Sequence, residues 1–342
     1  MVLSTTISNQ KILLTKIKKF RNFNFLLPFL ILNLLNFRMI AQEPDFKVYE
    51  SKLVLKSFCQ LGEGSFWDSK RKKLWFVDIE RGEVHHFIPK SGQSGFFKTG
   101  QKVGTLVPSF EKDEMVLGLQ DGIYKSDLRG TQIQKIAVIQ KMNSNQRLND
   151  GKCDPNGLFW VGSLNMGPKS KDSHLFHLDE SEKVVVKLDS VSISNGIVWS
   201  KDKKKMYYID TPTRTIQSFD FDMITSEISN RRVVVHTPDS LGWPDGMAID
   251  DNDNLWIGMW GGFCVSIWSP KTGKMVGRVN VAAKNVTSCA FGGDNEKTLY
   301  ITTAREGLKK EELEKYPLSG CLFKSEVGIS GPQMSYWVSG KK

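Results

Sequence analysis

Motifs for metal and disulfide chemistry are scarce in this chain of 342 residues. Its five cysteines are odd in number, widely spread and without a CxxC pair. This argues against a disulfide framework and against a zinc site built on thiolates. The histidines, also five, include no HExxH motif, so a histidine-ligated metal is not expected.

A strong excess of positive charge is also missing once the first 42 residues are set aside. The formal charge is +10, but residues 1–42 hold six Lys and Arg and no acid, which leaves 41 basic against 37 acidic residues. No basic stripe interleaved with aromatic side chains follows, and KDKKK at residues 201–205 lies between strand-like runs. We therefore expect no nucleic-acid partner.

The apolar run FLLPFLILNLL at residues 25–35 is too short to cross a membrane. It has eleven residues and contains Pro28, whereas a spanning helix needs about 20. A basic stretch precedes it and MIAQ follows, which is the order of a secretory signal cleaved after Ala41. Residues 1–42 are thus expected to be a signal peptide that exports the protein. The alternative is that Met39 is the true start and the protein is cytosolic.

Helical periodicity is nearly absent from residue 53 onward, where short β-rich runs alternate with turns, so we predict an all-β chain. Six similar segments begin at residues 64, 108, 151, 195, 245 and 288. Their spacing of about 40 to 50 residues is that of one four-stranded blade. The sequence therefore predicts a six-bladed β-propeller over residues 43–342.

The acidic run DDNDN at residues 250–254 resembles a calcium loop, because oxygen-bearing side chains recur at alternate positions. The sixth position of such a loop is a glycine and the twelfth a glutamate, whereas here they are Leu255 and Gly261. We instead expect the run to be the solvated turn of a hairpin. Asp245, just ahead of the strand, is then the candidate for chemistry.

Equivalent positions of a propeller's repeats meet at one mouth of its central channel. Superposing the repeats places four oxygen-bearing side chains at or just before the start of a first strand: Glu63, Asn149, Asn195 and Asp245. Their convergence predicts a central site for a hard divalent cation, Ca²⁺, Mg²⁺ or Mn²⁺, with Zn²⁺ as an alternative.

Several sequence blocks between residue 59 and about residue 338 have a characteristic order. They are LGEGSFWD, RLNDGKCDPNGLFWVGS, SNGIVWS, YYIDT, PDGMAIDDNDNLWIGMWGG and TSCAFGGDN. In this order and spacing they resemble the family of regucalcin (senescence marker protein), gluconolactonase and luciferin-regenerating enzyme, which are six-bladed propellers.

The resemblance implies roles for five residues. One divalent metal would be held by the Glu of GEG, the Asn of SNG and the Asp of PDG, which are Glu63, Asn195 and Asp245 here. Arg147 and Asn149 of the RLNDG block would contact the substrate. The implied activity is hydrolysis of sugar lactones such as aldonolactones.

These residue types suit that chemistry. A bound cation polarises the lactone carbonyl and stabilises the charge that develops on its oxygen. Asp245, both ligand and carboxylate, is expected to be the general base that activates water, while Arg147 and Asn149 fix the oxygens of the sugar.

One block departs from the family pattern. Many members carry a longer loop in the third blade with a glutamate that meets the substrate, but GSLNMGPKSKDSH is short and contains no Glu. Asn165 is the nearest polar substitute, so we predict that it binds the substrate. Trp243 and Trp260 are candidates to stack on a sugar, with packing in the core as the alternative.

Three other functions fit the same residues. Polar side chains at strand starts can hold a structural cation or ordered waters without catalysis. A calcium-binding regulator that acts through protein contacts is a second alternative, and a metal-dependent phosphotriesterase of the same architecture is a third.

Overall fold

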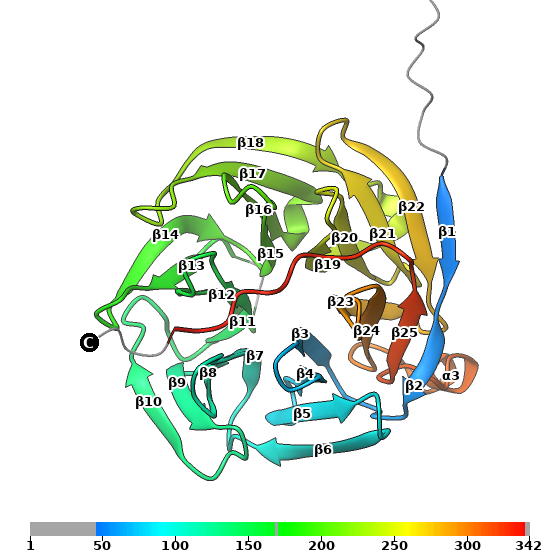
Figure 1. The fold of residues 1–342 in the computed structure, drawn as a ribbon, viewed down its shortest axis with the longest axis horizontal. Coiled ribbons are helices and arrows are strands. Elements are labelled where there is room, and N and C mark those ends of the chain that lie inside the picture. The colour runs from blue at the N-terminus through cyan, green and yellow to red at the C-terminus, as the bar shows by residue number, and fades with distance from the viewer. Residues whose placement is uncertain (1–45, 168–169, 339–342) are drawn as a thin grey trace, which may run out of the picture. The chain divides into compact units, whose positions relative to one another are not determined.

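The computed structural model describes residues 46–167 and 170–338, so the predicted leader at residues 1–42 lies outside the described part. Phe46–Lys342 form one compact unit. Six sheets stand around a central axis (Figure 1), which confirms the predicted all-β, six-bladed propeller. Among the described residues, no helix is long and apolar enough to cross a membrane.

Each blade is a meander that begins with an inner strand and ends at the rim. The first two blades contain β3 (Gly62–Asp68), β4 (Lys73–Asp78), β5 (Glu83–Ile88), β6 (Gln93–Lys98), and β7 (Val103–Pro108), β8 (Glu114–Leu119), β9 (Gly122–Asp127), β10 (Ile133–Ala137). The next two contain β11 (Gln146–Cys153), β12 (Phe159–Asn165), β13 (Ser173–Leu178), β14 (Val184–Val191), and β15 (Ser194–Trp199), β16 (Lys205–Asp210), β17 (Thr215–Phe221), β18 (Ile228–His236).

The last two blades use strands from both ends of the described chain. The fifth contains β19 (Trp243–Ile249), β20 (Leu255–Trp260), β21 (Cys264–Ser269), β22 (Lys274–Asn280), and the sixth contains β23 (Asn285–Gly292), β24 (Thr298–Ala304), β25 (Leu322–Glu326). The N-terminal strand β2 (Lys52–Leu55) pairs antiparallel with β25 and completes the sixth blade. The preceding strand β1 (Lys47–Glu50) adds a parallel fifth strand beside β22. The sixth blade, which joins β2 to β23–β25, closes the ring.

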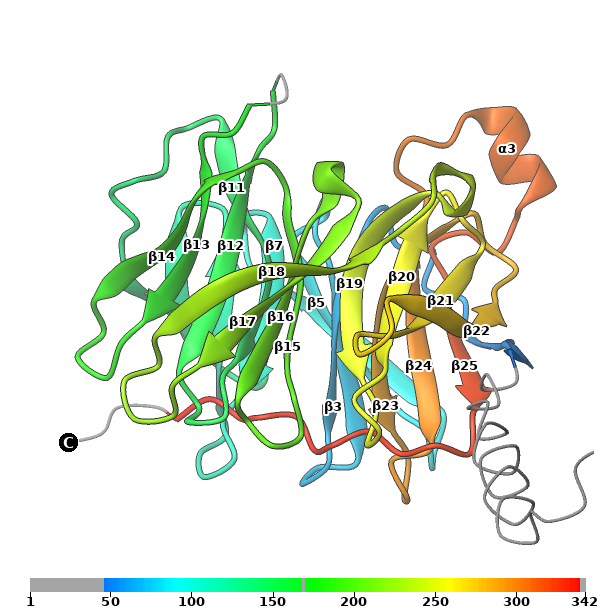
Figure 2. The same ribbon diagram turned by 90° about the horizontal axis from the view of Figure 1, so that it is seen from above.

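Short helical segments lie in the connections between strands: η2 (Thr211–Thr213), η3 (Asp239–Leu241) and α3 (Lys310–Lys315). On the opposite side, residues 327–338 form a C-terminal strap that runs across the end of the channel (Figures 1 and 2). The strap joins the inner hairpins of different blades, since Asp251 N donates to Ser330 O at 2.8 Å and Trp337 N donates to Pro108 O at 3.0 Å.

Buried Asp–Trp pairs organise the hairpin turns of three blades. Asp250 accepts hydrogen bonds from the backbone of Asn252 and Asn254 at 2.8 and 2.9 Å, and from Trp256 Nε1 at 3.0 Å. Asp68 and Asp154 accept from a tryptophan indole in the same way. Asp250 is fully buried, so the expectation of a wholly solvated turn is wrong for this residue. The turn itself is confirmed.

All six inner strands have an irregular register near their beginning. The shifts lie at Glu63/Phe66 in β3, Val103/Thr105 in β7, Leu148/Gly151 in β11, Asn195/Ile197 in β15, Pro244/Met247 in β19 and Val286/Cys289 in β23. Such bulges increase the local twist and re-aim a side chain. Four of the six bulges lie in the strands that carry the predicted site residues, which are β3, β11, β15 and β19.

Glycines next to the site residues let the inner strands approach one another. A Cβ atom on Gly196 would lie 2.6 Å from Met247 Cβ, and one on Gly246 would lie 2.9 Å from Ser288 Cβ. Real Cβ atoms almost never come that close. The SNG and PDG blocks thus need glycine so that β15, β19 and β23 can pack tightly around the channel.

Candidate functional site

A cavity of about 310 Å³ lies at the end of the channel where the inner strands begin. Five of the predicted site residues line it: Glu63, Arg147, Asn149, Asn195 and Asp245. They come from β3, β11, β15 and β19. The fold therefore brings together residues that are up to 182 positions apart in the sequence.

Glu63 and Asp245 form a pair of adjacent buried carboxyl groups. Burial raises the pKa of Glu63 to about 8, and the charge of Asp150 adds to this effect. Burial also raises the pKa of Asp245 well above its ordinary value, and the adjacent Glu63 raises it further. Burial and the repulsion between the two carboxyl groups thus both disfavour the state in which Glu63 and Asp245 are ionised together.

Asn149 links the third blade to the fourth. Its Nδ2 donates to Ser194 O at 2.7 Å and to Asn195 Oδ1 at 3.0 Å, while its Oδ1 accepts from Arg147 Nη1 at 2.6 Å. Asn195 is held in turn by Thr211, whose Oγ1 accepts from Asn195 Nδ2 at 2.8 Å. These bonds fix both amide groups, so the Asn195 oxygen has a defined position in the cavity wall.

The donor set fits a hard divalent cation. Glu63 Oε1 is buried and has no hydrogen-bond partner in the described part of the chain. Asn195 Oδ1 accepts one hydrogen bond there, and an amide oxygen has two lone pairs. No three His, Cys, Asp or Glu side chains of the described residues cluster as a metal site, so Asn195 would have to complete the set with Glu63 and Asp245. Ca²⁺ and Mg²⁺ prefer such oxygen ligands and fill other positions with water.

Arg147 is a buried cation among several acids. Burial lowers the pKa of its guanidinium, whereas the nearby charges of Glu80, Glu63 and Asp245 raise it. A guanidinium stays protonated in proteins. Arg147 therefore brings a permanent positive charge and several N–H donors to the cavity.

Asn165 does not line this cavity, although Leu164 beside it does. Its Nδ2 donates to Ser170 and Asp172 at 3.2 Å each, and its Oδ1 accepts from Gly167 N at 2.8 Å. The side chain is thus engaged in its own loop. The predicted contact of Asn165 with substrate stays a prediction, without support from this placement.

Glu306 is a cavity residue that the sequence analysis did not identify. Its Oε2 accepts from Gln60 Nε2 at 2.6 Å, and its backbone oxygen accepts from Asn285 Nδ2 at 2.9 Å. The available signal was its place shortly after an apolar strand, at the same mouth as Glu63. Thr211, of the YYIDT block, lines the cavity as well.

Trp243 and Trp260 form part of the cavity wall, as their sequence position suggested. Both side chains are half-buried. The guanidinium of Arg214 lies over the Trp243 ring at 3.6 Å from its centroid and holds that ring in place. The cavity wall thus contains two apolar indole rings as well as the carboxyl groups of Glu63 and Asp245.

The family described as "SMP-30/Gluconolactonase/LRE-like region" matches residues 61–305. The chain belongs to this family. The match contains Glu63, Arg147, Asn149, Asn195 and Asp245, so the whole cluster of predicted site residues lies within it.

Relatives in this SMP-30/gluconolactonase family align over most of the chain. One is "Putative sugar lactone lactonase YvrE" of Bacillus subtilis, 38% identical over 273 residues, which are 80% of this chain and 93% of that relative. Regucalcin of Danio rerio is 36% identical over 287 residues, 83% of this chain and 97% of the relative. A solved structure of luciferin-regenerating enzyme is 30% identical, with a TM-score of 0.79, and covers 84% of this chain and 98% of the other. The family thus includes proteins named as lactonases.

Proposed function

We propose that the protein hydrolyses sugar lactones with one divalent cation, which Glu63, Asn195 and Asp245 would hold. The observation that carries the proposal is the pair of buried carboxyl groups, Glu63 and Asp245, in a cavity that Arg147 also lines. Membership of a family with relatives named as lactonases supports the choice of reaction.

Asp245 would act as ligand and general base. When bound by Glu63, Asn195 and Asp245, the cation would supply Lewis-acid polarisation of the lactone carbonyl and would stabilise the negative charge that develops on its oxygen. The Asp245 carboxylate takes a proton from the attacking water and returns it to the ring oxygen as the acyl C–O bond breaks. The product is an open-chain hydroxy acid.

Arg147 and Asn149 would orient the substrate. The hydrogen bonds of Arg147 to described residues use only Nη1, toward Leu148 O and Asn149 Oδ1, so Nε and Nη2 are available for sugar oxygens. The amide oxygen and amide nitrogen of Asn149 both have hydrogen-bond partners already. Its main effect would therefore be to fix the side chains of Arg147 and Asn195 relative to each other. Precise orientation of this kind lowers the entropic barrier of the reaction.

The size of the cavity supports a small cyclic substrate. About 310 Å³ is at the lower end of the range for small-molecule sites, roughly 300 to 1,000 Å³. Trp243 and Trp260 offer apolar faces on which a sugar ring can pack. Pentono- and hexonolactones are therefore the substrates to test first.

The test measures the opening of pentono- and hexonolactones through the protons that the reaction releases. Each reaction is run on the purified protein, after removal of metal with a chelator, and after addition of Ca²⁺, Mg²⁺, Mn²⁺ or Zn²⁺. We expect opening above the spontaneous rate that disappears with the chelator and returns with one or more cations. Opening that is unaffected by the chelator would contradict the role of the cation.

A binding function without catalysis is the second candidate, because relatives of similar identity are named regucalcin rather than lactonase. Such a protein would titrate a divalent cation and leave the spontaneous rate of lactone opening unchanged. A phosphotriester hydrolysed faster than every lactone of the panel would instead favour phosphotriesterase activity at the same cation.

We also propose that the leader exports the protein, on the basis of its basic stretch and apolar run ahead of Ala41. N-terminal sequencing of the native protein tests this. A mature chain that begins at Gln42 is the expected result, and a chain that begins at Met39 would contradict it.

A further inference from the structure

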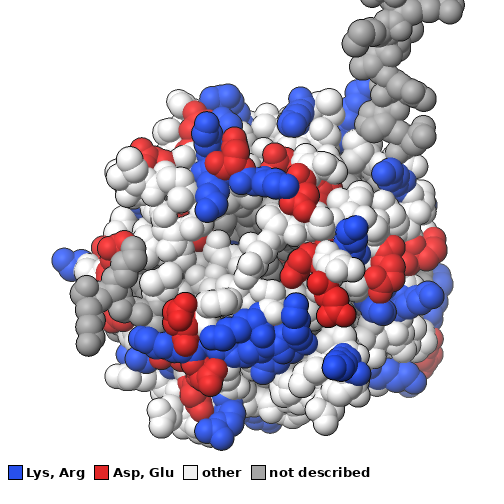
Figure 3. Space-filling model, viewed as in Figure 1, with Lys and Arg blue, Asp and Glu red and all other residues white. Residues whose placement is uncertain are grey.

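A second cavity, of about 130 Å³, lies at the opposite end of the channel. The inner strands β11, β15, β19 and β23 reach it with their last residues, whereas the candidate active site lies at their beginnings. Residues Pro332–Ser335 of the C-terminal strap border it as well. Figure 3 shows this face hollowed near its centre, with uncharged atoms in the hollow and charged side chains of both signs around it.

The walls of this strap cavity are largely apolar. Trp199, Ala248, Ile249, Phe291 and Met334 contribute to them. An engineered cavity of about 150 Å³ with such walls stays dry and binds benzene. The strap cavity therefore suits an apolar body of about six carbon atoms.

The charged side chains of the strap cavity all have one sign. Lys152, Lys201 and Lys203 line it, and no Asp or Glu does. Lys201 is paired with Asp251 at 2.8 Å. Lys152 and Lys203 form no ion pair at contact distance with the described residues, although the charge of Lys152 acts on the buried acids Glu63 and Asp150 and opposes the rise of their pKa. Lys152 Nζ donates to Met247 O, which leaves two of its three N–H groups for another acceptor.

A further donor lies in the same wall. Trp199 is 8% exposed, and its buried Nε1 has no hydrogen-bond partner among the described residues. Buried indole N–H groups normally have a partner. The strap cavity thus combines unsatisfied donors with an absence of lining carboxylates.

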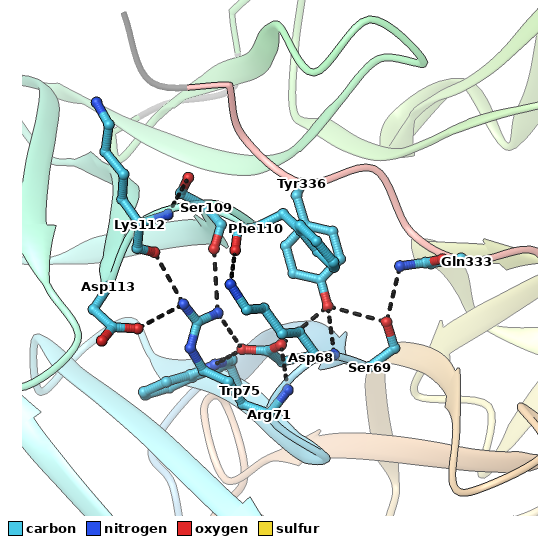
Figure 4. A network of polar contacts seen from close by, with 11 residues as sticks. Asp68, Ser69, Arg71, Trp75, Ser109, Phe110, Lys112, Asp113, Gln333 and Tyr336 are labelled. Atoms are coloured by element: carbon cyan, nitrogen blue, oxygen red, sulfur yellow. Dashed lines mark hydrogen bonds and ion pairs between the residues drawn. The ribbon is translucent and has the colours of Figure 1, made fainter.

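The strap that covers the cavity is anchored on the first blade (Figure 4). Tyr336 Oη donates to Asp68 Oδ1 at 3.0 Å and accepts from Lys70 N at 3.0 Å. Gln333 Nε2 donates to Ser69 Oγ at 2.9 Å. These bonds lie on both sides of Met334 along the chain, so the strap wall of the cavity is held in a defined position.

We propose that the strap cavity binds a small monocarboxylate with an apolar body of about six carbons. The body would fill the space between Trp199, Phe291 and Met334, and the carboxylate would accept hydrogen bonds from Lys152. This site lies at the other end of the channel from the candidate active site and does not depend on the lactonase proposal, although the charge of Lys152 also acts on Glu63.

The test is calorimetric titration of the full chain with hexanoate, with hexanol as the neutral control of the same length. We expect one hexanoate per chain and at least about tenfold weaker binding of hexanol, because hydrogen bonds to a charged group contribute about 1.5 to 3 kcal/mol. Equal binding of the two compounds, or no binding of hexanoate, would overturn the proposal.

Variants locate the binding. Lys152→Met should weaken hexanoate at least about tenfold, and Ala290→Leu, which fills the cavity wall, should also weaken it. Lys203→Gln should weaken it up to about fivefold, whereas the matched control Lys204→Gln, in the same turn and outside the cavity, should not. Both of these last side chains are exposed, so folding is preserved.

A variant of the other cavity separates this proposal from the first one. Glu63→Gln should not weaken hexanoate binding, since Glu63 lies at the other mouth and the loss of its charge near Lys152 would favour an anion. Binding that is lost in Glu63→Gln and kept in Lys152→Met would place hexanoate at the candidate cation site and overturn the inference.

Discussion

Asp245 has two roles in the proposed reaction, and replacement by asparagine separates them. The amide keeps an oxygen for the cation but cannot take a proton from water. For Asp245→Asn we expect kcat to fall at least about 100-fold at saturating cation, the usual contribution of a general base. The measurement is the rate of lactone opening over a range of cation concentrations. Turnover within threefold of the unmodified protein would reassign the base.

Glu63 is expected to act mainly on the affinity for the cation. Glu63→Gln removes one negative charge from the ligand set and keeps the shape of the side chain, so cation binding should weaken at least about tenfold. Calorimetric titration with Ca²⁺ or Mn²⁺ measures this directly. The matched control is Glu80→Gln, which changes an acid near Arg147 that does not line the cavity. Equal affinities of Glu63→Gln and the unmodified protein would contradict the assignment.

The convergence of three candidate residues in one cavity could be predicted from sequence because they occupy equivalent places in a repeat. Glu63, Asn195 and Asp245 each lie at the beginning of an apolar strand, and a propeller brings those places together. Glu306 was not predicted because it follows a strand instead of starting one. Asn165 was chosen by proximity in sequence, but its amide bonds within its own loop.

At the scale of the elements, the hairpin turns depend on buried carboxylates. Asp250→Ala would leave the Trp256 indole and two backbone N–H groups without an acceptor, so we expect a loss of about 3 kcal/mol in the free energy of unfolding. Asp251→Ala is the control in the same turn. It removes a half-exposed pair with Lys201 and the hydrogen bond from Ser330 Oγ, and its cost should stay below about 2 kcal/mol. Denaturant unfolding compares the two, and equal losses would contradict the assignment.

The glycines of the inner strands are a second feature at this scale. In Gly196→Ala the new methyl group would meet Met247 Cβ at 2.6 Å and Asp245 O at 2.9 Å. We expect a loss of about 1 to 3 kcal/mol in unfolding free energy, as for other overpacked sites, together with weaker cation binding as β15 and β19 move apart. Unchanged stability and affinity would show that the strands tolerate this spacing.

The type of the elements followed from sequence, but their polar interior did not. Alternating and fully apolar runs predicted the strands, since burial imposes these patterns. The run DDNDN looked solvated because it is polar throughout. Its first residue is nevertheless buried, and that depends on the Trp256 indole six positions later, which turns inward to meet it.

For the molecule as a whole, the repeat predicted the number of blades but not how the ring closes. The sixth segment supplies three strands, and β2, from the other end of the described chain, supplies the fourth. No local pattern specifies a pairing between residues about 270 positions apart, because strand partners are chosen by packing and register in the folded state. The same holds for β1, which pairs with β22.

The central claim is that Glu63, Asn195 and Asp245 hold one cation at the hub of the propeller. Anomalous diffraction from crystals of the protein grown with Mn²⁺ tests it most directly. We predict a single strong peak within bonding distance of one oxygen from each of the three side chains. A peak elsewhere in the channel, or none at a concentration of Mn²⁺ that supports lactone hydrolysis, would contradict the account.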